Sequence, residues 1–134
     1  MTEPTRERVN ASDADRPTAV SFLLIQNYTM ISLASAVEPL RMANQMAGRE
    51  LYSWQLLSED GAPVSASDGI TTVVDASISN PPPMDSLIVV GGIDVSHSYT
   101  QAQLDWLREL DEKGLQLGGI CTGCLLYTSD AADE

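Results

Sequence analysis

The sequence predicts an α/β fold built on a doubly wound, mostly parallel sheet with one antiparallel excursion. Two continuous apolar runs, at residues 18–25 and 86–90, are typical of strands that are buried on both faces. Two segments with helical periodicity, 31–46 and 102–113, follow these strands along the chain. The predicted order is strand, helix, strand, hairpin, strand, helix, strand and turn, which is the alternation that such a sheet requires.

The first part of the chain is predicted to form one strand and one helix. Residues 1–17 are polar and mixed in charge, which predicts a disordered leader. A strand over 18–25 and a loop over 26–30 lead into the helix over 31–46. Pro39 is expected to kink this helix or to break it after its first two turns. The apolar stripe of the helix comprises Leu33, Val37, Leu40 and either Met42 or Ala43.

The middle of the chain is predicted to contain a strand and a hairpin. Residues 52–58 are rich in β-forming side chains, and 59–61 form a turn. The segments 64–67 and 70–74 flank Asp68-Gly69, a dipeptide that suits the two-residue type I′ turn of an antiparallel hairpin.

The last part of the chain is predicted to complete the alternation of strands and helices. Three prolines at 81–83 predict an extended connector before the strand at 86–90. The helix over 102–113 ends at a C-cap for which Gly114 is suited, and a strand over 115–120 follows. Its core side chains are Leu104, Trp106, Leu107 and Leu110.

Composition restricts the class of protein. A chain of 134 residues, 43% of them hydrophobic, fits one domain with a core. No apolar run approaches the roughly 18 residues that span a bilayer, and the N-terminus lacks the apolar segment of a signal peptide, so we expect a cytoplasmic protein without membrane contact. The net charge of −12, with seven scattered Lys and Arg, disfavours nucleic-acid binding by this segment and agrees with a cationic ligand.

The segment Gly119-Ile120-Cys121-Thr122-Gly123 carries the clearest functional signal. Small residues on both sides of a central side chain, after a strand, are typical of a tight strand-to-helix turn that pushes that side chain into a cleft. The N–H groups of the next helix then lower the pKa of a thiol. Cys121 is therefore a candidate nucleophile or pocket floor, and the alternative is an inert buried thiol. Gly91-Gly92 is expected at the same edge of the sheet.

Two side chains are candidate proton partners for Cys121. His97, the single histidine, lies in a polar loop and either lines the cleft or is solvated. Glu38 lies on the mostly apolar face of the first predicted helix. Near the thiol its carboxyl would be buried with a raised pKa, and the alternative is an exposed Glu38 paired with Arg41. Neither residue completes a catalytic triad from spacing alone.

Other motifs predict no cofactor and no metal. Cys121 and Cys124 spell C-x-x-C, but they come too late in the chain for a redox pair, and no second Cys or His pair is present for zinc. Gly91-Gly92 is too short for a phosphate loop. Residues 125–134 interrupt the helix that is expected after the turn at Cys121, so we interpret them as a non-native or truncated end. We accordingly expect a sheet that is incomplete at the C-terminus.

Several of these segments resemble the N-terminal, ThiJ/PfpI-like domain of GlxA-type transcriptional regulators of the AraC/XylS family. The specific part is Ala-Val-Glu-Pro-Leu-Arg at 36–41, and the Gly-x-Cys-x-Gly elbow indicates the wider class I glutamine amidotransferase-like superfamily. The resemblance implies a flavodoxin-like fold, a partial sensor domain over 18–124, and a DNA-binding helix-turn-helix domain that is absent here. The similar segments are 22–25, 32–44, 48–52, 91–94 and 119–123.

The resemblance also implies a homodimeric sensor for a small-molecule inducer, an amine or amino acid of the quaternary-amine or arginine type, with DNA contacted only through the missing domain. Carried over by position, Glu38 matches a buried acid beside the elbow thiol, Gly91-Gly92 matches a loop that lends backbone N–H groups, and Cys121 and Thr122 complete the ligand contacts. Hydrolases of the superfamily have His directly after the Cys, so Thr122 indicates a pocket that has lost hydrolysis.

The alternative is a Cys121-dependent hydrolase or hydratase. Isocyanide-hydratase-like members of the same superfamily also show Cys-Thr-Gly at the elbow. They carry an Asp near the position of Glu38, and they lack the Glu-Pro-Leu-Arg run at 38–41 of this chain.

Overall fold

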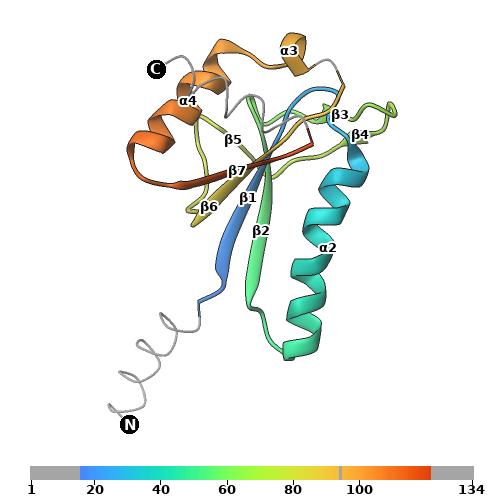
Figure 1. Ribbon diagram of the computed structural model, residues 1–134, viewed down its shortest axis with the longest axis vertical. Coiled ribbons are helices and arrows are strands. Elements are labelled where there is room, and N and C mark those ends of the chain that lie inside the picture. Colours follow the sequence, from blue (N-terminus) through green and yellow to red (C-terminus); the bar gives the residue numbers. More distant parts are fainter. Residues whose placement is uncertain (1–15, 94, 122–134) are drawn as a thin grey trace.

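A five-stranded, all-parallel sheet with the order β5-β2-β1-β6-β7 forms the centre of the protein (Figure 1). The computed structural model describes residues 16–93 and 95–121. The chain places β2 and β5 on one side of β1 and then crosses over to place β6 and β7 on the other side, so the predicted doubly wound, mostly parallel sheet is confirmed. The strands of the sheet are β1 (Thr18–Leu24), β2 (Tyr52–Ser58), β5 (Ala76–Ser77), β6 (Ser86–Val90) and β7 (Gln116–Ile120). The other elements are β3 (Val64–Ser65), β4 (Thr71–Thr72), α2 (Met30–Ala47), α3 (Val95–Ser98) and α4 (Gln101–Glu112).

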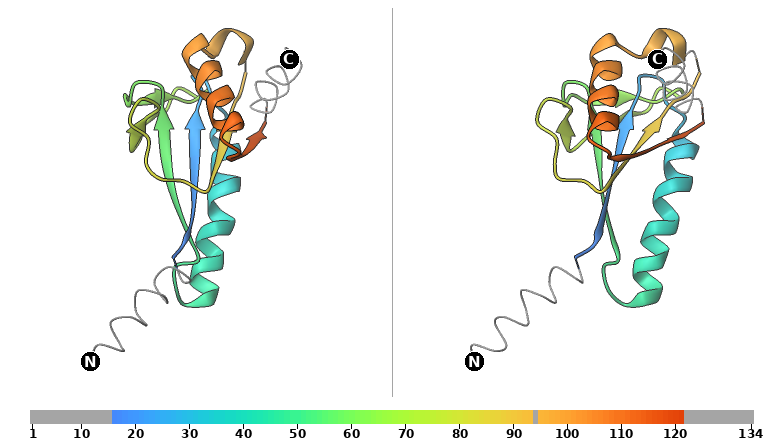
Figure 2. Two further views of the ribbon diagram at one scale, coloured as in Figure 1. Left: turned by 90° about the vertical axis from the view of Figure 1, so that its left-hand side faces the viewer. Right: turned by 60° about the vertical axis from the view of Figure 1, so that its left-hand side comes forward.

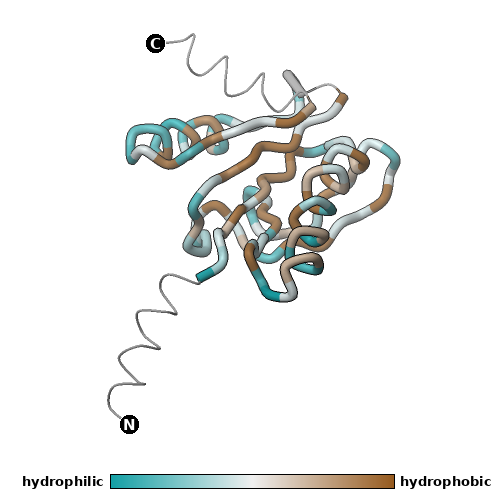
Figure 3. The backbone as a smooth tube through the Cα atoms, turned by 60° about the horizontal axis from the view of Figure 1, so that its bottom comes forward, coloured by the Kyte–Doolittle hydropathy of each residue, from teal (hydrophilic) through white to brown (hydrophobic). Residues whose placement is uncertain are grey.

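Helices α2 and α4 cover opposite faces of the sheet (Figure 2), and side chains of β1 alternate between them. Phe22 and Leu24 belong to the apolar cluster beneath α2, whereas Leu23 and Ile25 belong to the cluster beneath α4. All four are 1% exposed or less. The most hydrophobic residues accordingly concentrate in the central strands (Figure 3). Burial on both faces explains why apolar residues follow one another without alternation from Phe22 to Ile25.

Helix α2 continues without interruption through Pro39, so the predicted break is wrong. Pro39 cannot donate a hydrogen bond to the carbonyl of Ser35. Both residues are exposed, so water can satisfy that carbonyl while the helix continues. The predicted apolar stripe contacts the core through Leu33, Val37 and Leu40, whereas Met42 is 49% exposed.

The antiparallel hairpin β3–β4 lies where the sequence predicts it, but its turn is not type I′. A type I′ turn needs a positive φ at both central residues. Within the turn only Gly69 has one, at +88°, and its N–H donates to the carbonyl of Ala66 at 2.9 Å. Ser67 and Asp68 are therefore the central residues, and the left-handed glycine follows them.

Helix α4 lies within one residue of its predicted bounds. Thr100 caps its start, and Gln103 completes a capping box. Lys113 is the C-cap, and Gly114, with a φ of +83°, follows it. Trp106 and Leu107 are buried in the core, as predicted.

Some predicted features lie outside the described part of the chain. These are residues 1–15 of the leader predicted over 1–17, Thr122, Cys124 and the end at 125–134. Among the described residues, no helix has both the length and the apolar character needed to cross a membrane.

Asp85 ties the start of β6 to β1 and should make stability depend on pH. Its Oδ2 accepts the N–H of Ala19 at 2.7 Å, and its carboxylate lies 3.4 Å from the guanidinium of Arg16. These contacts, the backbone hydrogen bond above all, hold the pKa of Asp85 below its ordinary value. Such a carboxyl contributes stability above its unfolded-state pKa of about 4 and loses it as the pH falls through the lowered folded-state pKa.

We therefore expect the urea midpoint of the wild type to fall more between pH 6 and pH 2.5 than that of Asp85→Asn. An asparagine at this position does not titrate, which makes it the matched comparison. Equal acid sensitivity of the two proteins would show that the ionisation of Asp85 contributes nothing to stability.

Candidate functional site

The carboxyl end of β7 brings the predicted elbow next to the start of α2. Cys121 directly follows β7 and has a φ of +55°, a left-handed conformation that is uncommon for residues other than glycine. Its side chain is exposed, and its Sγ lies 3.5 Å from the Oγ1 of Thr29, the N-cap residue of α2. The hydroxyl of Thr29 makes no capping hydrogen bond, so it is directed to the thiol instead. The left-handed turn at Cys121 is thus present, and the thiol is exposed rather than buried. Whether the thiol is reactive or inert stays a prediction.

Gly91-Gly92 packs closely against the loop that precedes α2. A Cβ at Gly92 would lie 2.2 Å from the carbonyl oxygen of Asn27 and 2.8 Å from the nitrogen of Thr29. The carbonyl of Gly91 accepts the N–H of Thr29 at 3.0 Å, and the N–H of Gly91 donates to the carbonyl of Ile120 at 3.4 Å. The N–H of Gly91 is thus directed to the end of β7, and a ligand contact at Gly91 stays a prediction. A ligand contact at Gly92 stays a prediction.

Glu38 does not lie beside the elbow as a buried acid. It comes eight residues after Met30, which is roughly 12 Å further along the helix at 1.5 Å per residue. Its side chain is 54% exposed, and its Oε1 accepts hydrogen bonds from the Nε and Nη2 of Arg41 at 3.0 and 2.8 Å. The hydrogen bond and the charge of Arg41 lower the pKa of Glu38 rather than raise it. The i, i+3 spacing of Glu-Pro-Leu-Arg puts both side chains on one helix face, which explains the pair.

His97 lies in the short helix α3 rather than in a loop. Its side chain is exposed, in agreement with the solvated alternative.

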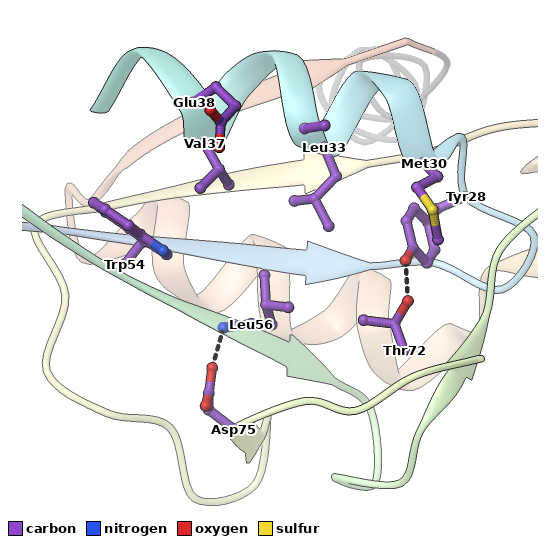
Figure 4. A pocket seen from close by; sticks show the side chains of 10 residues that line it. Tyr28, Met30, Leu33, Val37, Glu38, Trp54, Leu56, Thr72 and Asp75 are labelled. Carbon is purple, nitrogen blue, oxygen red and sulfur yellow. Dashed lines mark hydrogen bonds between the residues drawn. The ribbon is translucent and has the colours of Figure 1, made fainter. Parts of the chain in front are cut away.

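A cavity of about 510 Å³ lies between α2, β2 and the segment that follows the hairpin (Figure 4). Tyr28 and Trp54 supply aromatic surface, and the carboxylates of Glu38 and Asp75 supply negative charge. The hydroxyl of Tyr28 is hydrogen-bonded to that of Thr72, which fixes the ring. The remaining lining residues are Met30, Leu33, Ala34, Val37 and Leu56. Aromatic faces together with carboxylates favour a small organic cation.

Of the polar and aromatic residues that line this cavity, the sequence analysis names only Glu38 as a ligand contact, and it predicts that residue beside Cys121 rather than here. Tyr28, Trp54, Thr72 and Asp75 come from separate segments of the chain, and no short motif connects them. Within residues 16–93 and 95–121, no three His, Cys, Asp or Glu side chains form a group that could hold a metal ion.

Known proteins resemble this chain in both sequence and fold. The model of the DJ-1/PfpI family matches residues 19–133. The chain is 50% identical over 107 residues to the HTH-type transcriptional regulator GbdR of Pseudomonas aeruginosa, a match that covers 80% of this chain and 29% of GbdR. It is 33% identical over 120 residues to the HTH-type transcriptional regulator GlxA of Rhizobium meliloti, covering 89% of this chain and 37% of GlxA.

A solved structure agrees with these matches. The crystal structure of an AraC family transcriptional regulator from Pseudomonas putida superimposes with a TM-score of 0.76 at 26% identity, covering 87% of this chain and 62% of that one. The present chain therefore spans a minor part of the curated regulators that it matches.

Proposed function

Because the chain belongs to the DJ-1/PfpI family and matches a part of GbdR and GlxA, as its sequence resemblance predicts, we propose that it is the ligand-sensing part of a transcriptional regulator. In this proposal it acts as a cytoplasmic homodimer, and DNA is contacted by a further domain. GbdR and GlxA are HTH-type transcriptional regulators, which supports this role.

The ligand that we propose is a small amine. It is bound in the cavity of about 510 Å³ between α2 and β2, which we call the α2 cavity. The observation that carries this choice is the combination of two aromatic side chains, Tyr28 and Trp54, with Glu38 and Asp75 in one cavity. A cation over an aromatic face gains about 0.5–2 kcal/mol, depending on how far water is excluded. Arg41 holds Glu38 through Oε1, which leaves Oε2 for a cation. The net charge of −12 also raises the local concentration of cations.

We expect this chain to bind glycine betaine and to lose about tenfold in affinity in Trp54→Ala, which corresponds to about 1.4 kcal/mol. The measurement is isothermal titration calorimetry. The uncharged-headgroup analogue 3,3-dimethylbutanoate replaces the quaternary nitrogen by carbon and should not bind, because it lacks the positive charge. Trp106→Phe is the control, since Trp106 lies in the other apolar cluster beneath α4. Equal affinity in Trp54→Ala and Trp106→Phe would contradict the proposed site.

A Cys121-dependent hydrolase or hydratase is the second candidate function. It is favoured by one observation, the exposed thiol on a left-handed turn. The exposed thiol alone does not distinguish binding from turnover. The matches to transcriptional regulators are the reason that we propose a binding function without turnover. Turnover that disappears in Cys121→Ala would establish the enzyme instead.

A further inference from the structure

The side-chain amide of Gln103 is buried without satisfying its donors. Gln103 is 4% exposed and lies in the first turn of α4. Its Oε1 accepts the N–H of Thr100 at 2.8 Å, which fixes the orientation of the amide group. Among the described residues, its Nε2 has no hydrogen-bond partner. A buried donor without an acceptor costs about 1–3 kcal/mol, and such groups in folded proteins almost always have a partner. This amide therefore needs an acceptor that the described residues do not supply.

Gln103 lines a polar cavity of about 240 Å³ at the carboxyl ends of β1 and β2, at the upper edge of the sheet in Figure 1. Two carboxylates share the cavity, and each is fixed through one oxygen. The Oε1 of Glu59 accepts the hydroxyl of Thr100 at 2.8 Å, and the Oδ1 of Asp60 accepts the N–H of Ala62 at 3.0 Å. Within the described part of the chain, the second oxygen of each carboxylate has no partner. Ligands of parallel sheets bind at this edge.

The mixture of groups restricts what this cavity can hold. Gln103 requires an acceptor, and the N-terminus of α4 favours a negative group near it. An anion alone would face Glu59 and Asp60, and no described residue that lines the cavity is basic. A cation alone would leave the amide of Gln103 unsatisfied. The cavity volume of about 240 Å³ is several times the roughly 30 Å³ of one water molecule, so the cavity has room for a small organic molecule.

We propose that this cavity is a second binding site, which takes a small zwitterion of the amino acid class. The ligand's carboxylate accepts the Nε2 hydrogens of Gln103, and its ammonium group contacts the second oxygens of Glu59 and Asp60. The α2 cavity shares none of these residues, so the site stands independently of the proposed amine site.

The test is an NMR titration of this chain with three probes of similar size. L-alanine carries both charges, ethylammonium carries only the positive one, and propionate carries only the negative one. The side-chain amide signals of Gln103 are assigned by their disappearance in Gln103→Glu. We expect saturable shifts of these signals with L-alanine, and affinities at least tenfold weaker for ethylammonium and propionate. Absence of shifts with L-alanine, or an equal response to either single-charge probe, would overturn the proposal.

Two variants separate binding from folding. Gln103→Glu keeps an oxygen for the N–H of Thr100 but removes the donor, and Glu59→Gln keeps an oxygen for the hydroxyl of Thr100 but removes the charge. Each should weaken L-alanine binding at least tenfold, as followed on the backbone signal of Asp60. Gln116→Glu is the control, because it makes the same chemical change at an exposed position of β7. If Gln103→Glu fails to fold, Glu59→Gln decides, and unchanged affinity in a folded variant contradicts the site.

Discussion

Gly92→Ala is expected to destabilise the folded state of this chain by about 3 kcal/mol or more. The new Cβ would lie 2.2 Å from the carbonyl oxygen of Asn27 and 2.8 Å from the nitrogen of Thr29. Both are backbone atoms, so no side-chain rotation can relieve the collision. Overpacking typically costs about 1–3 kcal/mol, and a backbone obstacle places this substitution at or above about 3 kcal/mol. A domain has about 5–15 kcal/mol of total stability, so the urea midpoint should fall steeply.

The substitution should also disturb the carboxyl edge of the sheet, where Cys121 lies. Moving Gly92 away from the loop would separate Gly91 from Thr29, whose N–H it binds at 3.0 Å, and would displace Thr29 from Cys121. Gly118→Ala is the matched control on the neighbouring strand. There the closest atom to a new Cβ is the Cγ1 of Ile88 at 3.9 Å, which is an ordinary contact. Comparable destabilisation by both substitutions would contradict the close approach at Gly92 as the cause.

The main elements of the fold could be predicted because their signals are local. The central strand β1 is a continuous apolar run, since Phe22 and Leu24 pack on one face and Leu23 and Ile25 on the other. By contrast, β5 consists of only two residues, and it exists because Leu57 and the next residue of β2 provide an edge for it. A strand of this kind has no periodicity to detect. The continuity of α2 through Pro39 likewise depends on which face the proline occupies.

The site was predictable only where a single segment determines it. The elbow at Cys121 follows from small residues around one strand end, and the left-handed φ of +55° agrees. The role assigned to Glu38 required a distance between α2 and β7, which the sequence does not contain. Trp54 and Gln103 had no such signal, because each acquires its surroundings from distant segments. Gln103 was recognisable in the sequence only as part of a helix.

Phe22→Ala is the second substitution from which we expect a large effect. Phe22 is fully buried in β1, the central strand, where it pairs in register with Leu56 of β2 and Ile88 of β6. Truncation of a buried Phe to Ala costs about 3–5 kcal/mol, because both the apolar transfer energy and the packing around the ring are lost. Helix α2 has no fully buried residue of its own, so its attachment depends on sheet side chains such as Phe22.

The expected result is therefore a large fall in the urea midpoint, together with looser packing of α2, seen as faster hydrogen exchange along that helix. Ile31→Ala tests the assignment of the buried face. Ile31 lies on α2 and is 72% exposed, so removing its apolar side chain should change the free energy of unfolding by no more than about 0.5 kcal/mol. If Ile31→Ala destabilised the chain as much as Phe22→Ala, the outer face of α2 would have to be buried in solution, against a second copy or another partner. A small effect of Ile31→Ala alongside a large one of Phe22→Ala would establish the sheet-facing side of α2 as the face that holds this helix.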